Sequence, residues 1–238
     1  MGAYRFGLPP YTRLTSSMDS HPGGDISHKS TFFIKRLKKN IIFDFKYSYI
    51  RCEKLLVTKM GNVRVFRCKI CRDPYIGENP PSRCPFCGAF ECYFILAEKW
   101  VPSEYIFEIS AISKSNLMAA LKLELDNTAF YLCAMNASKE KGDEYGYAEF
   151  KALKKVENEH ADAILKFLKI KKPNLDDISC SEDFKKNSQE GWEREDRAIK
   201  AYAKFAKEAP EKQLKQFFES LVEIETDHLD IHAENLKK

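Results

Sequence analysis

LKKVENEHADAILKF (residues 153–167) and LVEIETDHLDIH (residues 221–232) are two amphipathic stretches, and each carries a Glu-x-x-His pair. The pairs are Glu157 with His160 and Glu225 with His228. Residues three apart lie on the same side of an α-helix, so each pair shares the apolar face of its helix. Because a buried carboxylate is costly without a partner, the two pairs indicate a metal site between packed helices.

The periodicity around these stretches predicts four long helices, at residues 113–140, 145–170, 181–208 and 211–237. Gly142 separates the first two helices, Pro210 separates the last two, and residues 171–181 connect the middle pair. A helix of about 25 residues is about 38 Å long, and an extended segment of about 11 residues reaches about the same distance. The connection can therefore run the length of the bundle, which predicts two helical hairpins joined by a crossover, as in ferritin-like bundles.

The other two helices each place a glutamate on the apolar seam, Glu124 and Glu195. The two halves of the bundle repeat. Glu195 follows Glu124 by 71 residues, and the second Glu-x-x-His pair follows the first by 68 residues. Four carboxylates carry the charge that balances two divalent cations. The predicted dimetal site, which is also the predicted catalytic site, consists of Glu124, Glu157, His160, Glu195, Glu225 and His228.

Three further polar residues lie on these seams. Tyr131 and Tyr202 follow Glu124 and Glu195 by two turns and are also 71 residues apart. They either hydrogen-bond to the metal ligands or pack in the core, and their positions on the helices are compatible with both interpretations. His232 follows His228 by one turn, and we expect it either to support the ligands from behind or to lie at the edge of the site, and not to be a ligand itself.

Two Cys-x-x-Cys pairs precede the helices. Cys68 and Cys71, with Cys84 and Cys87, predict a tetrahedral thiolate site for iron or zinc. The surrounding sequence predicts strands at residues 63–66 and 93–96 and turns at 75–81. Nearby aromatic residues either shield an iron ion from water or form an ordinary core; these are Phe66, Tyr75, Phe86, Phe90 and Phe94.

The remaining four cysteines, Cys52, Cys92, Cys133 and Cys180, are scattered. The N-terminus lacks the apolar segment of a secretory signal, so we expect a reducing cytoplasm and no disulfide framework. No apolar run approaches the roughly 18 residues that would span a membrane.

Charge is uneven along the chain. Residues 1–59 hold 11 Lys and Arg against 4 Asp and Glu, whereas residues 60–238 hold 28 against 31. We therefore expect no nucleic-acid partner for the body of the chain. We expect residues 1–59 to be a disordered or non-native leader. An alternative is that the natural chain starts at Met60, because the organised sequence begins directly after it. The predicted domains are this leader, a metal domain at 60–102 and the helical bundle at 103–238.

The combined motifs resemble those of the rubrerythrin family, in the reversed order in which the rubredoxin-like domain precedes the ferritin-like diiron domain. The resemblance implies an α+β multidomain protein, with a one-iron centre and a diiron centre. It also implies a homodimeric, NAD(P)H-linked peroxidase that reduces hydrogen peroxide to water. A reductase or rubredoxin would then donate electrons through the one-iron domain. Two positions depart from the family pattern: Ala198 replaces a further glutamate, and Arg72 replaces a glycine after the first Cys-x-x-Cys.

Other functions remain compatible with these motifs. The bundle also fits a ferroxidase, another iron-handling protein or an oxygen-reducing oxidase. A non-enzymatic alternative is a zinc ribbon that binds a partner and is attached to a metal-stabilised bundle. The fused one-iron domain favours the peroxidase, because it would deliver electrons to the bundle and iron storage requires no such delivery.

Overall fold

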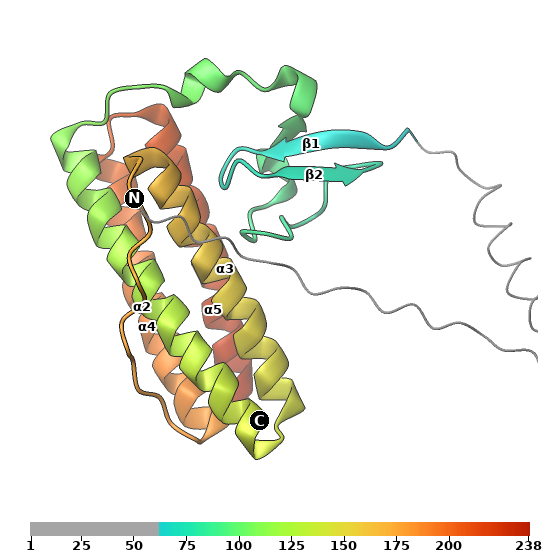
Figure 1. Cartoon of the computed structure of the whole chain (residues 1–238), viewed down its shortest axis with the longest axis vertical. Helices are drawn as coiled ribbons and strands as arrows, with labels where there is room; N and C mark the ends of the chain where they lie inside the picture. Colours follow the sequence, from blue (N-terminus) through green and yellow to red (C-terminus); the bar gives the residue numbers. More distant parts are fainter. Residues whose placement is uncertain (1–61) are drawn as a thin grey trace, which may run out of the picture. The chain divides into compact units, whose positions relative to one another are not determined.

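The computed structural model describes residues 62–238 (Figure 1). The predictions of a leader at 1–59 and of a natural start at Met60 concern residues outside this range. Among the described helices, none combines the length and the apolar character that crossing a membrane requires.

The first part of the described chain is a small antiparallel sheet in the order β2-β1-β3. Its strands are β1 (Arg64–Cys68), β2 (Pro74–Gly77) and β3 (Phe94–Leu96). Phe66 in the central strand lies opposite Tyr75 on one side and Leu96 on the other. The predicted strands at 63–66 and 93–96 correspond to β1 and β3. The prediction of turns alone at 75–81 is wrong at its start, because β2 pairs with β1 there.

Only some of the predicted aromatic shell is buried. Phe66 and Phe94 lie in the core and Tyr75 packs against it, whereas Phe86 and Phe90 are exposed. Three short 3-10 helices complete the metal domain and lead to the bundle: η1 (Glu91–Tyr93), η2 (Ala97–Lys99) and η3 (Pro102–Tyr105).

Four long helices form the second part: α2 (Ala111–Lys141), α3 (Glu144–Leu168), α4 (Phe184–Glu208) and α5 (Lys212–Lys237). Each boundary lies within three residues of the prediction. Ser110, Asp143 and Asp183 cap the first three helices, each accepting a hydrogen bond from the backbone N–H three residues later. Gly142 ends α2 with a φ of 71°, a conformation that glycine adopts without strain.

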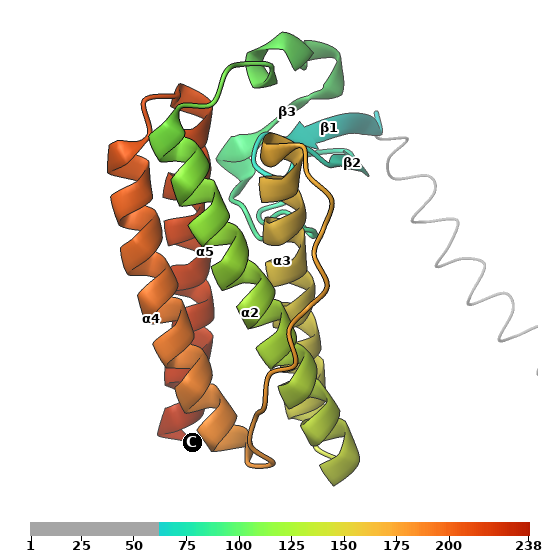
Figure 2. The same ribbon diagram turned by 60° about the vertical axis from the view of Figure 1, so that its left-hand side comes forward.

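The helices form two hairpins, α2 with α3 and α4 with α5. Residues 169–183 join them by running along the side of the bundle, from the end of α3 to the start of α4 at the other end (Figure 2). This is the predicted ferritin-like crossover, and it places all four glutamate-bearing faces toward one core.

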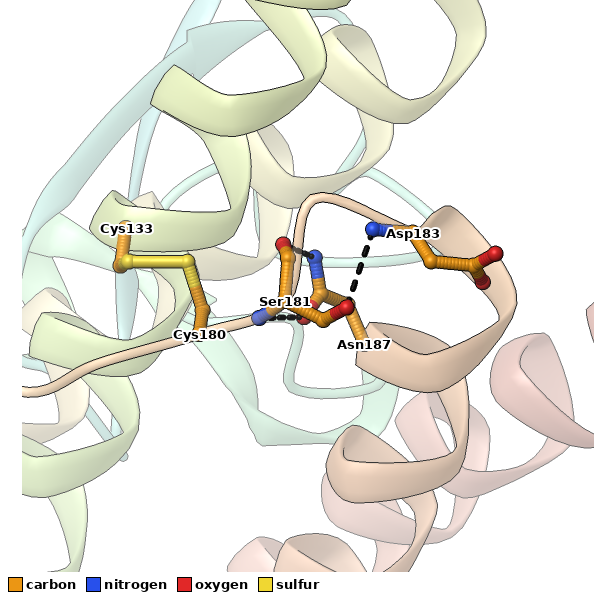
Figure 3. The surroundings of a disulfide bond; sticks show 5 residues. All are labelled: Cys133, Cys180, Ser181, Asp183 and Asn187. Atoms are coloured by element: carbon orange, nitrogen blue, oxygen red, sulfur yellow. Dashed lines mark hydrogen bonds between the residues drawn. A yellow bond between two sulfur atoms is a disulfide. The ribbon is translucent and has the colours of Figure 1, made fainter.

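One disulfide fastens the crossover to the bundle, between Cys180 and Cys133 of α2 (Figure 3). Ser181 beside it exchanges two hydrogen bonds with Asn187 in the first turn of α4, at 2.8 and 2.9 Å. The expectation that the scattered cysteines would stay unpaired is therefore wrong for these two. Their separation of 47 residues hides the pairing, which depends on the path of the crossover.

The metal domain packs directly on the bundle. The Tyr93 hydroxyl donates to Glu223 of α5 at 2.9 Å, and the Lys166 ammonium of α3 donates to the Cys71 carbonyl at 2.8 Å. A Cβ atom on Gly88 would lie 3.0 Å from Ile224 of α5, so the second Cys-x-x-Cys turn closely approaches the bundle.

Candidate metal centres

The four paired cysteines converge in the metal domain. Cys68, Cys71, Cys84 and Cys87 are almost wholly buried, and their sulfur atoms lie within 4.8 Å of one another. Two of the Sγ–Sγ distances, Cys68 to Cys87 and Cys71 to Cys84, are 3.8 Å, far longer than a disulfide bond. A tetrahedral ion with metal–sulfur bonds of about 2.3 Å holds its sulfurs about 3.8 Å apart, so this donor set fits one iron or zinc ion.

The two residues that follow the Cys-x-x-Cys turns share a left-handed backbone. Gly88 has a φ of 77° and Arg72 a φ of 71°. Arginine therefore adopts the conformation for which glycine is the favoured residue. Its guanidinium lies 4.2 Å from the ring centre of Phe167 and donates a hydrogen bond to the Ala163 carbonyl, both in α3, so the strained residue also ties the metal domain to the bundle.

In the bundle, the six predicted ligands come together in the core. Two overlapping groups have potential ligand atoms within 4.8 Å of one another: Glu124, Glu157, His160 and Glu225, and Glu157, Glu195, Glu225 and His228. Glu157 and Glu225 belong to both groups, so they lie between the other four. His228 is 6% exposed and the other five residues are fully buried.

Many ligand atoms of this cluster lack hydrogen-bond partners in the described part of the chain. They are Oε2 of Glu124, both carboxylate oxygens of Glu157 and Glu225, and Nδ1 of His160 and His228. A folded core rarely leaves so many polar atoms unpaired in one place. Metal ions would satisfy them, and the mixture of carboxylate oxygen and imidazole nitrogen fits iron. The oxygens of the two shared glutamates lie close to the histidine nitrogens, with Glu225 3.0 Å from Nδ1 of His160 and 2.7 Å from Nδ1 of His228, but make no hydrogen bond. These atoms would be the shared donors of a site for two ions.

The electrostatics of the cluster also fit bound cations. Burial, reinforced by Glu225, raises the pKa of Glu195 to about 8, and burial together with the same neighbour raises the pKa of Glu157 well above its usual value. Burial opposes ionisation of Glu225 too, but His160 and His228 lower its pKa to about 2. Cations among these carboxylates would favour the ionised form of all four.

Both seam tyrosines hydrogen-bond to predicted ligands across the bundle. The Tyr202 hydroxyl of α4 donates to Glu124 of α2 at 2.6 Å, and the Tyr131 hydroxyl of α2 contacts Glu195 of α4. The hydrogen-bonding alternative therefore describes both tyrosines, which are also fully buried in the core.

Ala198 is buried and offers no ligand, as its identity requires. The 71-residue repeat relates it to Asn127, whose amide lies 3.4 Å from Oε2 of Glu195. Neither position therefore supplies a further carboxylate to the cluster, because Asn127 offers a neutral amide and Ala198 a methyl group.

The two centres are connected inside a single chain. His160 directs Nδ1 toward the carboxylates, 3.0 Å from Glu225 Oε1, and its Nε2 lies 2.9 Å from the backbone carbonyl oxygen of Cys87. If Nδ1 binds a metal, Nε2 carries the proton and donates to Cys87. A ligand of the bundle site then hydrogen-bonds to the backbone of a ligand of the cysteine site.

These features define a class of proteins in which a four-cysteine cluster precedes a ferritin-like bundle, whose core holds a carboxylate–histidine cluster that fits metal ions. The rubrerythrin family model matches residues 115–236, which is more than half of the chain. The chain therefore belongs to the rubrerythrin family, whose members bind iron. No curated protein and no solved structure matches the chain in the other two comparisons.

Sequence reasoning found all ten residues of the two clusters but missed three features around them. Asn127 could have been found from the repeat, because it follows Glu124 as Ala198 follows Glu195. The role of the Cys87 carbonyl had no sequence signal, since it depends on how the domains dock. The contact between His232 and Tyr131, at 2.8 Å, was also missed.

Proposed function

We propose that the protein reduces hydrogen peroxide to water at the bundle site, with electrons supplied through the tetracysteine site. Each peroxide consumes two electrons and two protons and gives two water molecules. The observation that carries the proposal is the 2.9 Å contact between His160 Nε2 and the Cys87 carbonyl, because it joins the two sites by one hydrogen bond.

The residues of the bundle supply the required environment. Glu124, Glu157, His160, Glu195, Glu225 and His228 would hold two iron ions. When bound there, the iron ions would supply the two electrons that cleave the O–O bond. Burial excludes bulk water from the ligands, and the tyrosine hydroxyls hold Glu124 and Glu195 in fixed orientations.

The cysteine site would return electrons one at a time, since a single iron ion held by four thiolates exchanges one electron. An NAD(P)H-linked reductase or a rubredoxin would be the donor. A homodimer stays a prediction, because the hydrogen bond that links the two centres lies within one chain and needs no second copy.

The link between the centres favours this function over three of its alternatives: a ferroxidase, an iron store and a zinc ribbon. A ferroxidase or an iron store needs no electron inlet, and a zinc ribbon would have no electrons to pass to His160. An oxygen-reducing oxidase would use the same connection, so the choice of oxidant requires kinetics.

The electron route can be tested with Cys84→Ser, which removes one thiolate from the metal domain. Cys92→Ser is the matched control, because Cys92 is an exposed free cysteine outside the four-cysteine cluster. We expect the wild type and Cys92→Ser to bind three metal ions per chain, to show a red centre that bleaches on reduction, and to turn over peroxide repeatedly.

Cys84→Ser should bind two ions and lose repeated turnover. Equal turnover by Cys84→Ser and the wild type would contradict the electron route. A colourless wild-type protein with zinc at the cysteine site would support the zinc-ribbon alternative.

A further inference from the structure

His232 is a fully buried histidine that the proposed mechanism does not use. Its Nε2 lies 2.8 Å from the Tyr131 hydroxyl, and the two rings are nearly parallel with centres 5.7 Å apart. The same hydroxyl contacts Oε1 of Glu195. One phenolic oxygen thus lies between a predicted metal ligand and an imidazole.

The single proton of the Tyr131 hydroxyl determines the direction of both hydrogen bonds. A metal-bound carboxylate only accepts, so Tyr131 must donate to Glu195. The phenolic oxygen then accepts from His232, which must carry its proton on Nε2. Burial lowers the pKa of His232 to about 3, which is consistent with a neutral ring that has one N–H.

The other nitrogen agrees with this tautomer. Nδ1 of His232 has no hydrogen-bond partner in the described part of the chain. Its nearest carboxylate oxygen, Oε1 of Glu149, is 3.8 Å away, and both oxygens of Glu149 accept from Asn235 instead. An unpaired lone pair is tolerated in a core better than an unpaired N–H, so the proton belongs on Nε2.

Gly191 of α4 makes room for the imidazole. A Cβ atom at this position would lie 2.5 Å from Nε2 of His232. Glycine weakens a helix interior relative to alanine, and Gly191 is in the interior of α4. The space that it leaves is therefore used by His232.

The internal repeat shows that this arrangement belongs to one half only. The 68-residue spacing relates His232 to Ile164, and the 71-residue spacing relates Gly191 to Ala120. Ile164 and Ala120 are both buried and apolar, so neither side chain can donate to Tyr202. Ala120 and Ile164 in the first half thus correspond to Gly191 and His232 in the second. Of the two tyrosines, Tyr131 contacts a histidine in addition to its glutamate, and Tyr202 does not within residues 62–238.

We propose that His232 is a positioning residue that holds the Tyr131 hydroxyl as a donor to Glu195, and so makes the two metal positions of the bundle unequal. The inference rests on the proposed use of Glu195 as a metal ligand. Groups that orient a metal ligand typically contribute tenfold to a hundredfold in metal affinity. Because Glu195 belongs only to the group that contains His228, the effect should fall on one ion.

Titration of the anaerobic full chain with Co²⁺ tests this without measuring turnover. Thiolate-bound Co²⁺ absorbs differently from Co²⁺ held by carboxylates and imidazole, so the two centres are read separately. We expect His232→Phe, which keeps an aromatic ring but loses the N–H, to weaken one bundle ion at least tenfold. His232→Gln, which restores an N–H donor near the same place, should stay within threefold of the wild type.

Two further variants separate positioning from a structural effect. In a Tyr131→Phe background, His232→Phe should cause no additional loss of affinity, because the hydroxyl through which it acts is gone. Ile164→Val, the matched change in the other half, should leave both bundle affinities unchanged. If His232→Phe does not fold, Gly191→Ala perturbs the same imidazole and should weaken the same ion.

The outcomes distinguish this inference from the proposed function. A bundle that binds no Co²⁺ would overturn both. Two bound ions whose affinities are the same in His232→Phe and the wild type would overturn only the role of His232. An equal loss in the Tyr131→Phe background, or from Ile164→Val, would also overturn it.

Discussion

Replacing Cys133 with serine removes the disulfide that fastens the crossover to α2. The bridge joins residues 47 apart and therefore closes a loop of about this length in the unfolded chain. In the chain-entropy model, a loop of this size contributes roughly 4 kcal/mol to the free energy of unfolding at 25 °C. For a domain of this size, each kcal/mol changes Tm by about 2–4 °C, so Cys133→Ser should lower Tm by about 8–16 °C.

Thermal unfolding followed by circular dichroism, with and without a thiol reductant, measures this effect. Cys92→Ser is again the control, because Cys92 is free and exposed. Under oxidising conditions, the control should match the wild type and Cys133→Ser should be less stable. Reductant should lower the Tm of the wild type and leave that of Cys133→Ser unchanged. A Tm for Cys133→Ser within 2 °C of the wild type would refute the reasoning.

Two further predictions concern the ligand environments. Arg72→Ala keeps the left-handed backbone strain and loses the contacts with α3, whereas Arg72→Gly loses both the strain and the contacts. In urea unfolding we therefore expect Arg72→Ala to be the less stable of the two by about 1 kcal/mol. The opposite order of stability would contradict the strain. The pKa of Glu195 rises from its usual 4.5 to about 8 in the folded metal-free chain. Protonation of Glu195 therefore stabilises the folded state fully below about pH 4.5, and this stabilisation declines as the pH rises from about 4.5 to about 8. Chelator-treated protein should lose stability between pH 6 and 8.5, and Zn²⁺ should restore it; a metal-free chain that gains stability over this range would contradict the assignment.

The features that the sequence predicted well are those with local periodicity. The four helices follow from the spacing of apolar residues and from breaks at Gly142 and Pro210. The clustering of the six candidate ligands in the bundle core follows from acidic residues on apolar seams. The repeat between Glu124 and Glu195 strengthened the prediction, because two halves with the same pattern seldom arise by chance.

What the sequence did not reveal depends on distant parts of the chain coming together. The pairing of Cys133 with Cys180 depends on the route of the crossover, and the contact of His160 with Cys87 depends on domain docking. The strand β2 was missed because its residues favour turns, and its pairing with β1 outweighs that local preference. Arg72 shows the same principle, since contacts with α3 accompany a backbone conformation that its residue type disfavours.

The central claim is that the bundle site reacts with hydrogen peroxide and receives its electrons through the cysteine site. Stopped-flow absorbance of the anaerobically reduced protein, mixed with peroxide or with oxygen at equal concentration, tests this claim most directly. We predict that peroxide oxidises the protein much faster than oxygen and that the red absorbance of the cysteine site returns as electrons leave it. Oxidation by oxygen at an equal or greater rate would contradict the account and would assign the protein to the oxidases or ferroxidases.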